Sequence, residues 1–152
     1  MGDKKTMRIM GVDMGSHTIG LAISDESALI AQGLETIKRR STEEDLKEIT
    51  RVIDQFKIEK IVVGLPKNMN GTLGKQAEMV LQWIEALKKR IPLPVVTWDE
   101  RLTTVGATKI LLEADLSRKK RKKVVDQLAA ALILQGFLDQ DRNLKDGGSL
   151  AL

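Results

Sequence analysis

Residues 7–25 read MRIMGVDMGSHTIGLAISD, and this stretch decides the fold class. Residues alternate in character from Met7 to Asp13 and again from Thr18 to Ser24, which predicts two β-strands. The residues between them are turn-like, so the strands are predicted to pair as an antiparallel hairpin. Asp13 ends the first strand, and Gly20 and Ala22 leave one face of the second strand open to close packing.

The pattern changes after this hairpin. A third strand is expected within residues 28–37, and residues 41–44 (STEE) form a capping box that starts a helix reaching Phe56. Short apolar strands at 61–64 and 95–98 then alternate with helices, which requires parallel pairing through crossovers. We therefore expect an α/β fold with a mixed five-stranded sheet, an antiparallel meander plus parallel strands, and helices on both faces. Three more helices are predicted. The first begins at Ala77 and ends before Pro92, the second covers roughly Val105 to Ala114, and the third runs from Val124 to Leu138.

Composition excludes several classes of protein. The chain has 152 residues, with 25 Lys and Arg against 21 Asp and Glu, one His and no Cys. Disulfides, cysteine nucleophiles, thiolate metal sites and histidine-rich zinc sites are therefore excluded. We expect a single domain over residues 1–152, with a core at about 7–138 and flexible termini at 1–6 and 139–152. No apolar run approaches the ~20 residues of a membrane span, and no secretion signal is seen, so a cytoplasmic protein without a membrane partner is expected.

Cations are concentrated in one run that precedes the last predicted helix. Like charges packed so closely repel one another unless a polyanion relieves them, which favours contact with a nucleic-acid backbone. A solvated helix start or loop is an equally open interpretation. This basic run consists of Arg118, Lys119, Lys120, Arg121, Lys122 and Lys123.

Three acids lie in unusual places. Asp13 ends the first strand, Glu100 follows the last strand, and Asp126 lies on the apolar stripe of the last helix. Ligands of open α/β sheets bind at the carboxyl ends of strands, so these acids are candidate ligands of Mg²⁺ or Mn²⁺ in a site that cleaves phosphodiesters. Each acid alone has an ordinary explanation, as a turn residue, as a partner of Arg101, or as an acid in the first turn of a helix. Together they favour the metal site.

Four segments resemble the motifs of the YqgF family, also called RuvX, which comprises Holliday-junction-resolvase-like nucleases of the ribonuclease H superfamily. The resemblance covers most of residues 7–138. It is carried by residues 11–25, 62–72 (VVGLPKNMNGT), 99–104 (DERLTT) and 126–135 (DQLAAALILQ).

The resemblance implies a ribonuclease H-like fold and a role in maturing the precursor of the small-subunit ribosomal RNA. It also implies that Asp13, Glu100 and Asp126 are metal-binding catalytic acids. His17 departs from the family, which usually carries Lys or Arg at this position. A neutral imidazole there would weaken a phosphate contact.

Further candidate substrate ligands are His17, Lys67, Asn68 and Arg101. Lys67 and Asn68 either contact the substrate or belong to a structural loop that turns at Asn70-Gly71. Arg101 either pairs with Asp99 as a structural partner or clamps the scissile phosphate, and we favour the clamp.

The favoured hypothesis is a metal-dependent endonuclease acting in the 5′ maturation of pre-16S rRNA. Its partner would be nucleic acid, with structured RNA favoured over branched DNA, and a pre-ribosomal particle is a further expected partner. The protein would be a monomer or a homodimer. One alternative is a Holliday junction resolvase that acts on branched DNA. Another is a non-catalytic nucleic-acid-binding module. A further alternative is a phosphotransferase or ATPase of the actin-like group, although these enzymes need two lobes of this kind and the chain has room for one.

Overall fold

A computed structural model of the chain describes residues 7–102 and 118–147, with the side chains of the last helix described from 126 to 142. The predicted helix from Val105 to Ala114 lies outside these residues. No helix in the described ranges is long and apolar enough to cross a membrane.

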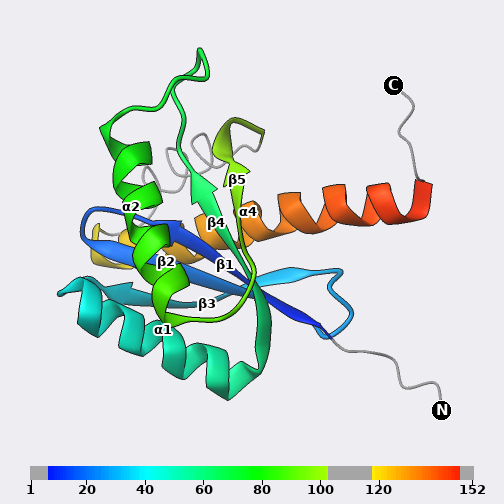
Figure 1. Cartoon of the computed structure of the whole chain (residues 1–152), viewed down its shortest axis with the longest axis horizontal. Coiled ribbons are helices and arrows are strands. Elements are labelled where there is room, and N and C mark those ends of the chain that lie inside the picture. The colour runs from blue at the N-terminus through cyan, green and yellow to red at the C-terminus, as the bar shows by residue number, and fades with distance from the viewer. Residues whose placement is uncertain (1–6, 103–117, 148–152) are drawn as a thin grey trace.

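Five strands form one mixed sheet in the order β3-β2-β1-β4-β5 (Figure 1). The antiparallel meander comprises β1 (Arg8–Met14), β2 (Thr18–Ser24) and β3 (Ala31–Lys38), whereas β4 (Ile58–Leu65) and β5 (Val95–Asp99) continue it in parallel. Both parts of the predicted sheet are thereby confirmed. The carboxyl ends of β1, β4 and β5 meet at one edge of the sheet, together with the β1–β2 turn.

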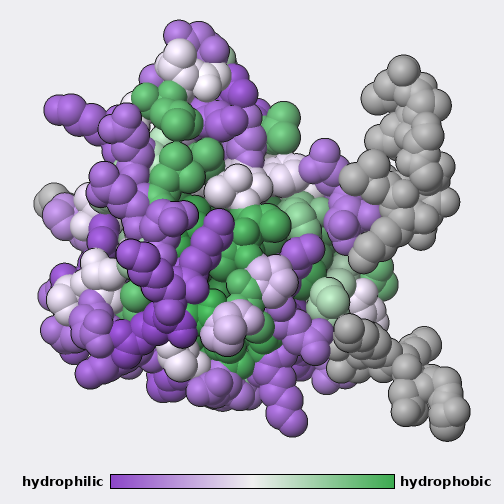
Figure 2. Space-filling model, in the orientation of Figure 1, coloured by the Kyte–Doolittle hydropathy of each residue, from purple (hydrophilic) through white to green (hydrophobic). Residues whose placement is uncertain are grey.

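Two helices cover one face of the sheet, α1 (Thr42–Phe56) and α2 (Lys75–Arg90). The predicted capping box is confirmed, because the Ser41 hydroxyl accepts the backbone N–H of Glu44 at 3.1 Å. The bond satisfies an N–H group that has no partner within the helix. Figure 2 shows hydrophilic side chains over α1, while hydrophobic ones gather at the centre of the view, where the edge strand β5 runs.

The helix α4 (Arg118–Gly147) covers the opposite face and packs with its own apolar cluster against the sheet (Figure 1). It begins at Arg118, the first residue of the basic run, and continues to Gly147, so the predicted start at Val124 and the predicted end at Leu138 were wrong. The tail predicted at 139–152 is helical as far as Gly147, and residues 148–152 lie outside the described residues. Asp139 bonds to Gln135 and Arg142, each at 2.9 Å. Such pairs one turn apart stabilise a helix whose apolar periodicity has ended.

Candidate active site

Asp13 lies between two glycines in one row across the sheet. It pairs directly with Gly20 on β2, and the β1–β4 register, continued by one residue beyond Val12 and Val63, brings Gly64 alongside it. Residues in one row project to the same face, which here is the face that α4 covers. Only 6% of Asp13 is exposed, so this carboxylate is nearly buried at the end of β1.

Asp126 occupies the space above Gly20. A Cβ placed at Gly20 would collide with the main-chain carbonyl of Asp126, and it would lie 3.2 Å from the Asp126 Cβ. Only glycine allows the helix to come so close. The Thr18 hydroxyl donates a 2.6 Å hydrogen bond to Asp126 Oδ2, a length typical of a hydroxyl bonded to a carboxylate. The Asp126 side chain is therefore tied to β2, the strand next to Asp13.

Glu100 occupies the space above Gly64. It opens the short helix η1 (Glu100–Leu102) directly after β5. A Cβ placed at Gly64 would lie 2.9 Å from Glu100 Oε2 and 2.5 Å from Ile133 Cδ1 on α4. The two glycines thus leave room for one acid on each side of Asp13, and the structure brings all three predicted acids to one face at one edge of the sheet.

The three acids do not form a closed metal-binding cluster. Within residues 7–102 and the described part of α4, no group of three or more His, Cys, Asp or Glu side chains is arranged to hold an ion. The donor set still fits Mg²⁺ or Mn²⁺, because it consists only of carboxylate oxygens. Neighbouring strands lie about 4.8 Å apart, and the three acids lie beside one row of residues that crosses three neighbouring strands.

Arg101 is held by Asp99, which is the structural alternative to the predicted phosphate clamp. Its Nη2 lies 2.7 Å from Asp99 Oδ2, and its Nη1 donates to the Met69 carbonyl at 3.2 Å. The hydrogen bond from Arg101, aided by the nearby charge of Lys67, lowers the pKa of the Asp99 carboxyl. In this structure Arg101 therefore fastens the loop after β4 to the residue that precedes Glu100.

Asn68 also has a structural role, in the loop that follows β4 and turns at Asn70-Gly71, as one of the two interpretations of the sequence predicts. Its side-chain amide donates to Thr72 Oγ1, and its backbone N–H donates to the Thr72 carbonyl, both at 2.9 Å. The Asn70-Gly71 turn closes with a 2.8 Å bond from the Gly71 N–H to the Asn68 carbonyl. Lys67 is partly exposed at the start of this loop.

His17 is exposed in the β1–β2 turn. Its carbonyl accepts the backbone N–H of Arg39 at 2.9 Å, and the Arg39 guanidinium donates to the Gly15 carbonyl at 3.1 Å. Sequence analysis missed this role of Arg39, since nothing local links it to the turn. The backbone of the basic run belongs to α4, but its six side chains lie outside the described part of the chain.

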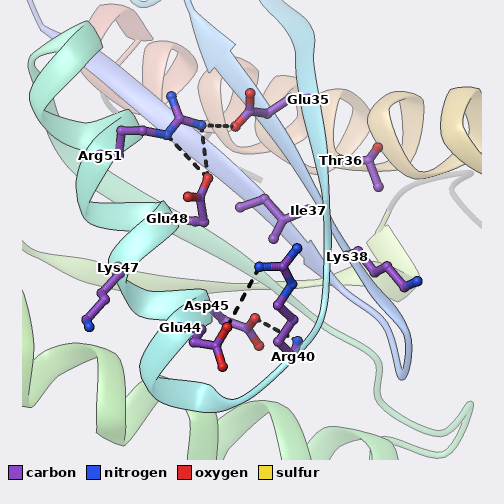
Figure 3. Close-up of a pocket in the computed structure, with 10 residues that line it drawn as sticks. All are labelled: Glu35, Thr36, Ile37, Lys38, Arg40, Glu44, Asp45, Lys47, Glu48 and Arg51. Atoms are coloured by element: carbon purple, nitrogen blue, oxygen red, sulfur yellow. Dashed lines mark hydrogen bonds and ion pairs between the residues drawn. The ribbon is translucent and has the colours of Figure 1, made fainter.

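A hollow of about 490 Å³ lies between β3 and α1, on the face opposite the acids (Figure 3). Its charges are largely compensated by one another. Arg51 binds Glu35 at 2.7 Å and Glu48 at 3.2 Å, while Arg40 lies 3.8 Å from Glu44. The row through Asp13, rather than this hollow, is the candidate active site.

Comparison with known proteins agrees with this geometry. Residues 7–140 match the family model described as "RuvX: Holliday junction resolvase". A "Putative pre-16S rRNA nuclease" of Desulforamulus reducens is 56% identical over 133 residues, covering 88% of this chain and 97% of the relative. Its counterpart in Thermoanaerobacter pseudethanolicus is 56% identical over 138 residues, covering 90% of this chain and 99% of the relative.

Solved structures show the same fold. RuvC of Thermus thermophilus, in complex with a Holliday junction substrate, superposes with a TM-score of 0.56 at 18% identity, over 89% of this chain and 96% of that one. A fowlpox virus resolvase bound to Holliday junction DNA superposes with a TM-score of 0.51 at 10% identity, over 88% of this chain and 98% of that one. The mixed sheet and its helices are therefore those of a ribonuclease H-like fold, as expected.

Proposed function

The chain belongs to the RuvX family of Holliday junction resolvases, and from this membership we propose that it is a metal-dependent endonuclease that cleaves pre-16S rRNA during 5′ maturation. The observation that carries the proposal is the row of Gly20, Asp13 and Gly64, beside which Asp126 and Glu100 lie. The relatives that match nearly their full length are named for a nuclease with this substrate.

Asp13, Glu100 and Asp126 are the residues that would hold Mg²⁺ or Mn²⁺. A bound ion of this kind lowers the pKa of water and neutralises charge on a phosphoryl group. The protein's part is to present the carboxylates in fixed positions. Thr18 restrains Asp126 through its hydroxyl, and Asp13 is nearly buried at the end of β1.

Substrate binding would extend from the acids along cationic residues. The basic run would neutralise backbone phosphates, Lys67 would contact RNA near Glu100, and His17 would contact it at the β1–β2 turn. Asn68 and Arg101, which also hold the loop after β4 in place, would contact the RNA beside that loop. The protein would bind this RNA in its folded form, as part of a pre-ribosomal particle in the cytoplasm. One chain carries one set of three acids, so a monomer suffices for single-strand cleavage.

Resolution of branched DNA is a second candidate function, which the description of the matching family model favours. Symmetric cleavage of a junction requires two sites related by a two-fold axis, and hence a homodimer. The two functions therefore differ in substrate and in the oligomeric state of the active species.

Cleavage of two labelled substrates tests the proposal. A pre-16S rRNA fragment spanning the mature 5′ end and a synthetic four-way DNA junction are incubated with Mg²⁺, with Mn²⁺, or with chelator. We expect metal-dependent cleavage of the RNA by the wild type and none by Asp13→Asn, Glu100→Gln or Asp126→Asn. Asp54→Asn, an exposed change on α1, is the matched control and should cleave normally. RNA cleavage that survives in chelator or in Asp126→Asn would refute the proposed site, and cleavage of the junction alone would favour the second function.

The fold of these variants should be intact. Removing one of three neighbouring carboxylates relieves their mutual repulsion, so stability in the absence of metal should stay unchanged or rise. Thermal unfolding in chelator measures this effect and separates loss of chemistry from loss of fold.

A further inference from the structure

Lys38 ends the edge strand β3 on the same face of the sheet as the three acids. It pairs directly with Thr18, the residue whose hydroxyl binds Asp126. Directly paired residues of antiparallel strands project to the same face, so the Lys38 side chain leaves the sheet on the Asp126 side. Lys38 is among the residues that line the hollow between β3 and α1, but Figure 3 shows its side chain directed away from α1, unlike that of Ile37.

Lys38 differs from the two cations that follow it. The Arg39 guanidinium lies 3.6 Å from Asp45 and donates to Gly15, so it is used to hold the β1–β2 turn. Arg40 lies 3.8 Å from Glu44 on the α1 side. The Lys38 side chain is exposed and makes no hydrogen bond or ion pair with the described side chains. Among the described residues it is therefore a cation on the acid face with no counter-charge.

Its place in the sheet decides which phosphate it can reach. Lys38 lies two strands from Asp13 and two residues beyond the row of Asp13, so with strands about 4.8 Å apart and a rise of about 3.3 Å per residue roughly 12 Å of sheet separates their backbones. A phosphate held by the acids is therefore beyond a close contact with Lys38, but a neighbouring phosphate on the same nucleic-acid strand is within its reach. β3 is an edge strand, and Figure 1 shows the first turns of α4, whose backbone carries the basic run, at the same end of the sheet.

We infer that Lys38 binds a backbone phosphate that flanks the scissile one, and that the nucleic acid crosses the end of β3 between the acids and the basic run. This inference rests on the proposed nuclease function. A single ammonium group is by itself a weak site for free phosphate. The ligand it fits is a polyanion already held at neighbouring points.

Binding of a labelled pre-16S rRNA fragment at several KCl concentrations, in chelator, tests this inference. Lys38→Ala should weaken binding about fivefold at low salt, and it should lower the slope of log affinity against log salt by roughly one unit. Lys38→Arg should bind like the wild type, because it keeps the charge. Lys47→Ala is the matched control, since Lys47 is an exposed lysine on α1 at the opposite face, and it should change neither quantity.

The outcomes separate this inference from the proposed function. If the wild type binds the RNA and Lys38→Ala has the same affinity and slope, the inference is wrong and the proposed function stands. Equal losses in Lys38→Ala and Lys47→Ala would also overturn it, because they would reflect net charge alone. If the wild type neither binds nor cleaves the RNA, both are wrong. Unaltered thermal unfolding of Lys38→Ala in the same buffer confirms that the fold is retained.

Discussion

Thr18 and Asp126, residues 108 positions apart in the chain, are joined by a hydrogen bond of 2.6 Å between Thr18 Oγ1 and Asp126 Oδ2. The bond ties the start of β2 to α4 at the point where Gly20 lets the helix approach the sheet. A candidate metal ligand is thus held by a hydroxyl that no local pattern identifies. Hydrogen bonds to ligating carboxylates orient them and tune their affinity.

Thr18→Val should therefore weaken metal binding. Valine keeps the size and shape of threonine but cannot donate to Asp126, so the carboxylate loses its restraint. We expect the affinity for Mn²⁺, measured by calorimetry in the absence of substrate, to fall about tenfold or more. Thr18→Ser keeps the donor and should restore most of the affinity. An unchanged affinity in Thr18→Val would mean that this bond has only a structural role.

Gly64→Ala should disturb the site more than the fold. The new methyl would meet Glu100 Oε2 at 2.9 Å and the end of the flexible Ile133 side chain at 2.5 Å, so the acid must move. A displacement of about 1 Å at a reacting centre costs on the order of 100-fold in rate, and we expect a loss of this size in kcat/KM for RNA cleavage. Gly33→Ala, which would meet Gln127 Cβ at 3.0 Å under the same helix, is the control that touches no acid. Equal rates for the two variants at equal stability would contradict the role of Gly64.

The basic run should control affinity rather than metal binding. Replacing Lys119, Lys120, Lys122 and Lys123 with Ala removes four cations, and the salt slope of RNA binding should fall by roughly one unit for each phosphate that is no longer neutralised. The affinity for Mn²⁺ should change little, since none of these side chains is a metal ligand. A salt titration of wild type against the quadruple variant measures the effect. Parallel lines would show that the run is only a solvated start of α4.

Asp25 should make the β2–β3 turn sensitive to acid. Its carboxylate accepts the backbone N–H groups of Ile30 at 2.9 Å and Leu29 at 2.7 Å, and these bonds, led by that from Ile30, lower the pKa of Asp25. A pKa depressed in the folded state means that the stabilisation is complete above the unfolded-state value, near 4. This stabilisation is then lost as the pH falls through the lower pKa that Asp25 has in the folded state.

Unfolding of wild type and Asp25→Asn at a series of pH values checks this sign. The advantage of the wild type should be constant at neutral pH and should shrink as the pH falls below about 4. Glu26→Gln, which alters the exposed neighbour, controls for the loss of one negative charge. An advantage that persists unchanged at low pH would show that the carboxylate charge does not hold this turn.

Local patterns in the sequence determined the elements and the face that each presents. Alternation identified β1 and β2, with Gly20 and Ala22 on the closely packed side, and the capping residue Ser41 located the start of α1. These features are local because a strand repeats every two residues and a helix every 3.6, so burial on one side leaves its trace in neighbouring residues. The same reasoning ended α4 too early, because polar pairs rather than apolar periodicity continue the helix beyond Leu138.

Only the tertiary structure decided how distant elements meet. The register of β1 with β4 brings Gly64 beside Asp13, and the end of β5 then places Glu100 over Gly64. The pairing of β2 with β3 likewise puts Lys38 next to Thr18 on the acid face. Strand order and register arise from contacts between residues far apart in the chain, and a shift of one residue would send each of these side chains to the other face. The sequence alone therefore predicted the three acids and the close-packed position of Gly20, whereas the fold brought Gly64, the Thr18 hydroxyl and Lys38 to them.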